Sequence, residues 1–176
     1  MGTINLVLYA PEIPQNTGNI MRTCIATNTV LHLIEPLGFS LDTKIIKRSA
    51  ANYQITPDFT YHLYKNVEEF LEKNQDGEFY FLTRYGHKGL YDVDASDTSK
   101  NYYFVLGSES SGIPLDILEK NVDRCIRLPM TDKVRSLNLS NCAAIITYEA
   151  LRQQGFVGLE LEEPEIFKGK NYLRKK

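Results

Sequence analysis

Short apolar runs alternate with segments of helical periodicity along most of this chain. The apolar runs predict strands at residues 4–9, 29–34, 58–63, 79–83, 102–106 and 124–128. The segments between and after them predict helices at residues 15–27, 42–49, 66–74, 114–120 and 139–153. Because parallel strands need a crossover between them, this order predicts an α/β fold with a mainly parallel sheet flanked by helices.

Length and composition favour one globular domain. The chain has 176 residues, of which 43% are apolar and 24% are charged. We expect a domain over residues 1–157 and a charged C-terminal tail over residues 158–176. The sequence shows neither a signal-peptide pattern nor an apolar run long enough to cross a bilayer. We therefore expect no membrane association and a cytoplasmic location.

Three polar segments directly follow predicted strands. They read PEIPQNTGNIMRTC at 11–24, LGSESSGIP at 106–114 and LPMTDKVRSLNLSNCAAIITYE at 128–149. The carboxyl ends of parallel strands meet at one edge of a sheet, where α/β proteins commonly bind their ligands. The sequence therefore predicts a ligand cleft formed by these three segments.

The middle segment has glycines five residues apart at Gly107 and Gly112, which allow a sharp turn and a close backbone approach to a ligand. It lacks both the GxGxxG pattern of dinucleotide sites and the Lys-Ser/Thr pair of phosphate loops. A turn before a helix near Pro114 would also explain the glycines. Glu109 is harder to explain in this way, because a carboxylate at a strand end is costly to desolvate without a partner or a task.

The two outer segments contain more polar residues than capping requires. Asn138 or Ser140 is a suitable N-cap for the last helix, which leaves Arg135 and other polar neighbours unexplained. Asn16 and Arg22 are six residues apart, so they need not share one helical face. A capping asparagine and a solvated arginine remain the alternative for that pair.

Together the three segments resemble the motifs of the SPOUT superfamily of RNA methyltransferases, in its 2′-O-ribose branch. The strings NTGNIMRTC and SLNLSN, with IEPLGF at 34–39, are most similar to the short tRNA (cytidine/uridine-34-2′-O)-methyltransferases, the TrmL group. The resemblance covers residues 4 to about 157. It implies the SPOUT α/β trefoil-knot fold and a homodimer whose pocket is built from both chains.

The resemblance also implies the reaction, which is methyl transfer from S-adenosylmethionine to the wobble nucleotide 34, cytidine or modified uridine, in the tRNA anticodon loop. S-adenosylhomocysteine would be the product. Arg22, Asn16, Glu109 and Asn138 match the catalytic set of the family. The cofactor is expected against the following residues: Leu82, Thr83, Gly107, Glu109, Gly112, Leu128, Met130, Ser136, Leu137 and Asn138.

Each catalytic residue has an expected role. A guanidinium stays protonated at neutral pH, so we expect Arg22 to hold a phosphate and to stabilise charge on the 2′-oxygen. Asn16 and Asn138 are expected to orient the arginine and the ribose, and Glu109 to fix the arginine or a loop N–H group. Tyr53 and Tyr85 are candidates for base stacking.

The net charge of −2 argues against a protein wrapped in nucleic acid, and DNA is not an expected partner. A local basic patch can still bind RNA on an acidic protein. Basic residues gather at Lys44, Lys47 and Arg48, and further ones fall in loops expected near the cleft: Arg84, Lys88, Lys133 and Arg135. The alternative is a charge-balanced, solvated surface.

Cysteine and histidine residues suggest no metal site. Three cysteines and three histidines are widely separated and lack metal-ligand spacing: Cys24, Cys125, Cys142, His32, His62 and His87. Buried, reduced thiols are the expected state of the cysteines.

Two stripes of apolar residues on helix 139–153, one of them containing Ile145 and Tyr148, favour a sheet contact and a subunit contact. Deep burial in a single core is the alternative.

Two other functions stay open. A ribosomal RNA 2′-O-methyltransferase would commonly carry an extra N-terminal RNA-binding domain, and here the first motif starts at Pro11. A non-catalytic RNA-binding or assembly protein should have lost Arg22 or Asn138, and the sequence keeps both.

Overall fold

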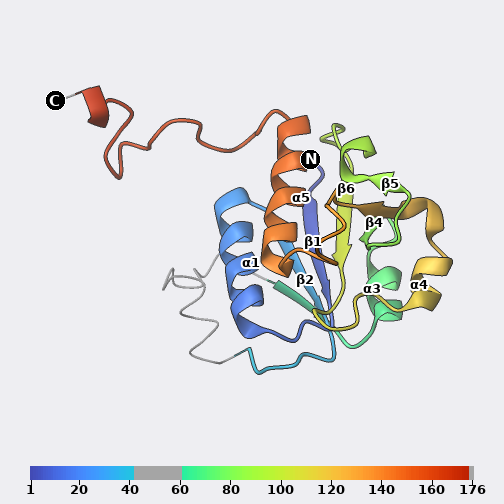
Figure 1. Cartoon of the computed structure of the whole chain (residues 1–176). Coiled ribbons are helices and arrows are strands. Elements are labelled where there is room, and N and C mark those ends of the chain that lie inside the picture. Colours follow the sequence, from blue (N-terminus) through green and yellow to red (C-terminus); the bar gives the residue numbers. More distant parts are fainter. Residues whose placement is uncertain (42–60, 175–176) are drawn as a thin grey trace.

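A computed structural model describes residues 1–41 and 61–174 of the chain (Figure 1). The strands are β1 (Ile4–Tyr9), β2 (Val30–Ile34), β3 (Tyr61–Tyr64), β4 (Gly77–Leu82), β5 (Lys88–Gly89), β6 (Asn101–Leu106) and β7 (Cys125–Arg127). The α-helices are α1 (Pro14–Thr27), α3 (Val67–Lys73), α4 (Leu115–Glu119) and α5 (Leu139–Gln153). Three 3₁₀ turns, η1 (Leu90–Asp92), η2 (Val122–Arg124) and η3 (Tyr172–Arg174), complete the described elements.

The strands form one sheet in the order β3-β2-β1-β6-β4-β7-β5. Every strand pairing in the described part of the chain is parallel. This confirms the predicted parallel α/β fold, and most predicted elements agree with the observed ones within about two residues. Strand β5 was not predicted, because two residues carry no periodicity. The predicted helix 42–49 and the first residues of the predicted strand 58–63 lie outside the described residues.

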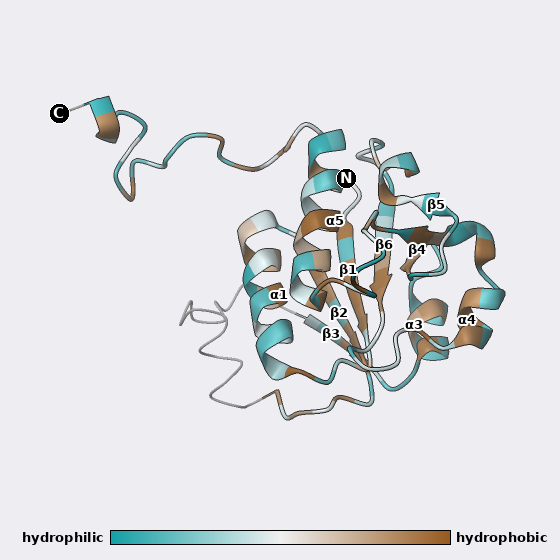
Figure 2. Ribbon diagram, viewed as in Figure 1, coloured by the Kyte–Doolittle hydropathy of each residue, from teal (hydrophilic) through white to brown (hydrophobic). Residues whose placement is uncertain are grey.

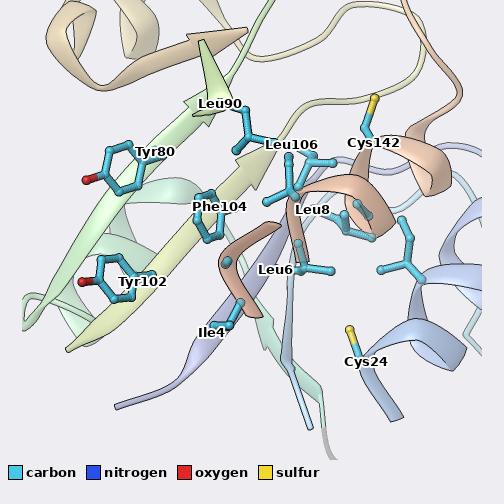
Figure 3. Packing of buried hydrophobic residues seen from close by; sticks show 14 of the residues in the cluster. Ile4, Leu6, Leu8, Cys24, Tyr80, Leu90, Tyr102, Phe104, Leu106 and Cys142 are labelled. Atoms are coloured by element: carbon cyan, nitrogen blue, oxygen red, sulfur yellow. The ribbon is translucent and has the colours of Figure 1, made fainter. Parts of the chain in front are cut away.

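Helices cover both faces of the sheet. Because side chains of a strand point alternately to opposite faces, each strand contributes to both sides of the core. In β1, Leu6 and Leu8 pack with residues of α1 and α5, whereas Val7 packs with residues of α3 and α4. Figure 2 shows apolar colour along the sheet, and Figure 3 shows the Leu6 and Leu8 side of the core. Both faces of the sheet are therefore buried, which explains the nearly continuous apolar strands.

The apolar face of α5 packs in the core, and the second stripe is only partly covered. Ile146 and Ala150 are buried in the core, whereas 51% of Tyr148 is exposed. After α5 the chain runs away from the sheet and the other helices, and it ends its described part at η3 (Figure 1). Leu161 and Ile166 in this segment are exposed. In the described residues, no helix is both long and apolar enough to cross a membrane.

A chain of buried polar side chains lies between the sheet and α3. The His32 ring contacts the Tyr64 hydroxyl through Nδ1 at 2.9 Å and the Asn5 Oδ1 atom through Nε2 at 3.1 Å. Because Asn5 Oδ1 can only accept, Nε2 carries the proton and Nδ1 accepts from Tyr64. Asn74 donates to Tyr64 and accepts from Tyr103, which completes the chain. The hydrogen bonds therefore fit a neutral His32.

The buried imidazole predicts acid sensitivity near pH 6. Burial, with a smaller contribution from His62, lowers the pKa of His32 to about 3 from 6.5. The unfolded chain binds a proton that the folded chain excludes, so stability is complete above about pH 6.5 and falls below it, by up to about 1.4 kcal/mol per pH unit. Denaturant unfolding between about pH 7.5 and pH 5 measures this slope.

The carboxyl groups of Glu78 and Asp94, whose pKa is lowered in the folded chain, have ordinary pKa values of 4.5 and 3.8. Such groups therefore change the free energy of unfolding mainly at lower pH. The variant His32→Gln should be less stable than the native chain but should lose the slope. A native unfolding free energy that stays constant across this window would contradict the assignment.

Candidate functional site

A cavity of about 600 Å³ lies at the carboxyl edge of the sheet. The ends of β4, β6 and β7, the start of α1 and the loop before α5 line it, and its volume is typical of a small-molecule site. Every residue that the sequence analysis assigned to the cofactor lines this cavity: Leu82, Thr83, Gly107, Glu109, Gly112, Leu128, Met130, Ser136, Leu137 and Asn138. The fold thus brings together residues that are distant in sequence.

The loop after β6 closes on itself through its backbone. Ser108 and Gly112 exchange two backbone hydrogen bonds, N to O, at 3.2 and 2.9 Å. The hydroxyl groups of Ser108 and Ser111 also contact each other at 2.7 Å. Gly112 has a φ of 72°, and a Cβ atom there would meet nothing within 4 Å. At Gly107 a Cβ atom would overlap the backbone of Gly112 and Ile113, so this turn requires glycine.

Glu109 holds the backbone just before α1 from across the sheet edge. The N-cap residue Ile13 has no side chain that could accept a hydrogen bond from the first turn. The Glu109 carboxylate accepts from the two backbone N–H groups that precede the helix, those of Glu12 at 2.8 Å and Ile13 at 3.3 Å. The Glu12 carboxylate in turn accepts from the N–H and hydroxyl groups of Ser110 at 3.0 and 2.6 Å. The two loops are thus joined by reciprocal carboxylate contacts.

One hydrogen-bond chain connects all three motifs. Asn16 donates from Nδ2 to Glu109 Oε1 at 2.9 Å, and its Oδ1 accepts from Asn138 Nδ2 at 2.9 Å. Asn138 is also the N-cap of α5, because its Oδ1 accepts from the backbone N–H of Ser140 at 2.9 Å. Within this hydrogen-bond network Glu109 also holds loop N–H groups, which is one of the roles expected for it. The two asparagines hold each other, and their expected role of orienting an arginine and the ribose stays a prediction.

Arg22 lies apart from this network. It is exposed on α1 and is not among the described residues that line the cavity. Asn16, in contrast, is buried and lines the cavity. Of the two stacking candidates, Tyr85 lines the cavity and Tyr53 lies outside the described residues, as do Lys44, Lys47 and Arg48.

Arg127 is a cavity residue that the sequence analysis missed. It lines the cavity together with Arg84 and Arg135, which were expected near the cleft. The available signal was its place at the end of a strand, one residue before the predicted contact Leu128. Lys133, also expected near the cleft, is not among the lining residues of the described chain.

Cysteine, histidine and carboxylate side chains do not form a metal centre in the described residues, where no group of three or more is arranged to hold an ion. The three cysteines are free and buried, as predicted. Burial raises the pKa of the Cys24 thiol to about 12 and also raises that of Cys142, which lines the cavity. Both thiols are therefore protonated at neutral pH.

Comparison with known sequences finds a match to the SpoU rRNA Methylase family over residues 3–148. A Listeria innocua protein, named as a candidate tRNA (cytidine(34)-2′-O)-methyltransferase, is 53% identical over 171 residues, which are 97% of this chain and 96% of that protein. The Escherichia coli protein named tRNA (cytidine(34)-2′-O)-methyltransferase is 39% identical over 161 residues, 91% of this chain and 99% of its own.

Solved structures show the same fold. A candidate RNA methyltransferase from Bacillus anthracis has a TM-score of 0.84 at 56% identity, covering 91% of this chain and 99% of its own. A structure from work on 2-OH methylation of C/U34 on tRNA has a TM-score of 0.79 at 35% identity, covering 88% and 97%. The SpoU methyltransferase AviRb of Streptomyces viridochromogenes, in complex with the cofactor AdoMet, has a TM-score of 0.71 at 20% identity, covering 90% and 59%.

The two loop glycines should differ in their tolerance of alanine. Gly107→Ala should lower the free energy of unfolding by roughly 3 kcal/mol, since the methyl group collides with fixed backbone. Gly112→Ala should cost about 1 kcal/mol, because the space is open and only the left-handed backbone is unfavourable. Urea unfolding of both variants tests this order. A Gly107→Ala chain that is as stable as Gly112→Ala would show that the loop is held in another way.

Proposed function

This chain belongs to the SpoU methylase family, and from that premise we propose that it is a tRNA 2′-O-ribose methyltransferase that modifies the wobble nucleotide 34, a cytidine or a modified uridine. The observation that carries the proposal is the convergence of the three motifs on one cavity, where Asn16, Glu109 and Asn138 form a single hydrogen-bond chain. The parallel sheet and the structural neighbours agree with the SPOUT fold that the motifs implied.

S-adenosylmethionine fits the cavity as the cofactor. Leu82, Leu128 and Met130 line the cavity and would offer apolar surface to its adenine. The loop from Gly107 to Gly112 offers backbone groups, and the open space beside Gly112 leaves that backbone accessible to a ligand. When bound, the cofactor supplies a methyl group that its sulfonium centre has already activated.

The main task of the protein is then to position the ribose hydroxyl and to help remove its proton. The hydrogen-bond chain through Asn16 and Asn138 fixes the start of α5 against the start of α1, and so it fixes the cavity walls. A guanidinium group is suited to hold a phosphate and to stabilise charge on the 2′-oxygen, which is the role proposed for Arg22, while the proton of the hydroxyl leaves to solvent or phosphate.

A homodimer would place Arg22 at an active site. Arg22 does not line the cavity of its own chain in the described residues, so we propose that it serves the cavity of a second copy. The partly covered stripe on α5, with Tyr148 exposed and Ile145 half-buried, offers the apolar surface for such a contact. Residues 131–138, which include part of the cavity wall, are exposed and would gain cover from the second copy.

Transfer RNA is a better-supported substrate than ribosomal RNA, because the relatives named above match over nearly their whole length and are named for tRNA. The presence of Arg22 and Asn138 counts against a non-catalytic RNA-binding protein. The proposed place of action is the cytoplasm, where tRNA is available. The domain would span residues 1–157, with residues 158–176 as an appended tail.

Methyl transfer to tRNA tests the proposal directly. Purified protein with labelled S-adenosylmethionine and total tRNA lacking wobble methylation should place the label on the 2′-oxygen of nucleotide 34. Arg22→Ala should lower the rate by roughly 100-fold or more with cofactor affinity nearly intact. Arg22→Lys should also fail, because an ammonium lacks the planar fork.

Arg124→Ala is the matched control, since Arg124 is exposed, pairs with Glu78 and is not a cavity residue. It should keep full activity. Label at another nucleotide, or in ribosomal RNA alone, would refute the assigned substrate, and an active Arg22→Ala chain would remove Arg22 from the mechanism.

Charge on the α5 surface should abolish dimerisation and activity together. We expect Ile145→Glu and Tyr148→Glu to yield monomers by light scattering, because a buried carboxylate is costly without a partner. Tyr148→Phe keeps the apolar ring and should remain a dimer. A native chain that is monomeric and fully active would contradict the shared site.

A further inference from the structure

Three arginines from separate segments meet at the cavity. Arg84 follows β4, Arg127 ends β7 and Arg135 lies in the loop before α5, and all three line the cavity. In the part of the chain that the structure describes, none of these arginines forms a salt bridge. We call these three residues the arginine rim. The nearby Glu109 carboxylate is already bound to Asn16 and to two backbone N–H groups.

The turn after β4 gives the rim a defined position. The Thr83 N–H donates to the Ile126 carbonyl at 2.9 Å, which holds the turn against β7. Arg127 donates from Nη1 to the Arg84 carbonyl at 2.6 Å, so one arginine is anchored on the backbone of the other. A Cβ atom at Gly86 would lie 2.6 Å from the Ile126 carbonyl carbon, which shows how closely the turn packs on β7.

An aromatic ring lies beside the rim. The Arg84 guanidinium carbon is 4.8 Å from the centre of the Tyr85 ring, and Nη2 donates to the Tyr85 hydroxyl at 2.5 Å. The Tyr85 residue is nevertheless 55% exposed. An exposed ring held next to cations is the combination that binds unpaired nucleotides, by base stacking and by phosphate contact.

A second, smaller hollow of about 270 Å³ adjoins the cavity and extends its positive charge. His87 and Lys88 line it, and it shares Arg127 and Met130 with the main cavity. Lys88 does not line the main cavity, and no salt bridge involves it among the described residues. The positive charge therefore continues beyond the space that a cofactor would fill.

The number and sign of these charges favour RNA as their ligand. S-adenosylmethionine carries one carboxylate, an amino group and a positive sulfonium, so three arginines and a lysine exceed its need for cations. A nucleotide chain carries a phosphate on each side of the target ribose, and arginine matches phosphate through its planar fork.

We propose that the arginine rim and Lys88 bind the phosphodiester backbone flanking the target nucleotide, and that Tyr85 stacks on an unpaired base of the same loop. This inference rests on the proposed function. The RNA strand would then run past the cavity along these four basic residues, which are distinct from the residues expected to bind the cofactor.

The test compares RNA and cofactor affinity in matched variants. The variants are Arg84→Gln, Arg127→Gln, Arg135→Gln and Lys88→Gln, with Lys120→Gln as the control. Lys120 is exposed at the end of α4 and does not line either hollow. The probes are S-adenosylmethionine and a synthetic tRNA anticodon stem-loop, and thermal unfolding checks that each variant is folded.

Each of the four variants should bind the stem-loop several-fold more weakly, and the slope of log affinity against log salt should fall by about 0.7 per lost phosphate contact. Affinity for S-adenosylmethionine should stay at the native value. A stem-loop with neutral methylphosphonate linkages on both sides of nucleotide 34 should bind the native chain more weakly, and Arg135→Gln should add little to that loss. Tyr85→Ala should lose roughly tenfold in RNA affinity, whereas Tyr85→Phe should keep it.

Some results would overturn the inference. Weaker cofactor binding with unchanged RNA binding would assign the rim to the carboxylate of the cofactor. RNA affinity and salt slope equal to those of Lys120→Gln would leave the rim without this role. If the native chain methylates nucleotide 34 while the variants behave like the control, only this inference fails. A native chain that neither binds nor methylates tRNA refutes the proposed function, and this inference with it.

Discussion

The carboxylate of Glu109 is the contact on which the geometry of the cavity depends. It binds the two backbone N–H groups just before α1, and it holds Asn16, which in turn accepts a hydrogen bond from Asn138. Asn138 then caps α5. A single carboxylate thus aligns two helix starts and one loop. Removing an unpartnered carboxylate from water costs free energy, and three hydrogen-bond donors offset this cost for Glu109.

The parallel sheet explains why this contact can form at all. Because all described strands run in one direction, the segments after β1, β4, β6 and β7 leave the sheet at one edge. Buried apolar residues pack both faces of these strands against helices, so the loops are held by a rigid base. Cofactor, hydroxyl and RNA strand would then meet above the same edge, the first in the cavity and the last along the arginine rim.

Much of this arrangement could be predicted from the sequence, though not all of it. The strand ends and motif glycines located the loops that form the cavity. The residues that the family resemblance assigned to the cofactor all line it. Arg127 was missed because its place at a strand end, one residue before Leu128, is its only local signal. The spacing of Arg22 and Asn16 did not decide whether they share one face of the helix. The packing of α1 shows that, of the two, Asn16 lines the cavity.

The sequence by itself determined the parallel α/β class, the order of the three motifs and the buried state of the cysteines, because these follow from hydrophobic periodicity and residue type. The tertiary structure alone decided which polar groups pair. Glu109 is separated from Asn16 by 93 residues, and Asn138 from Asn16 by 122 residues. Contacts of this kind are fixed by the packing of the whole sheet and its helices, and no local pattern in the chain records them.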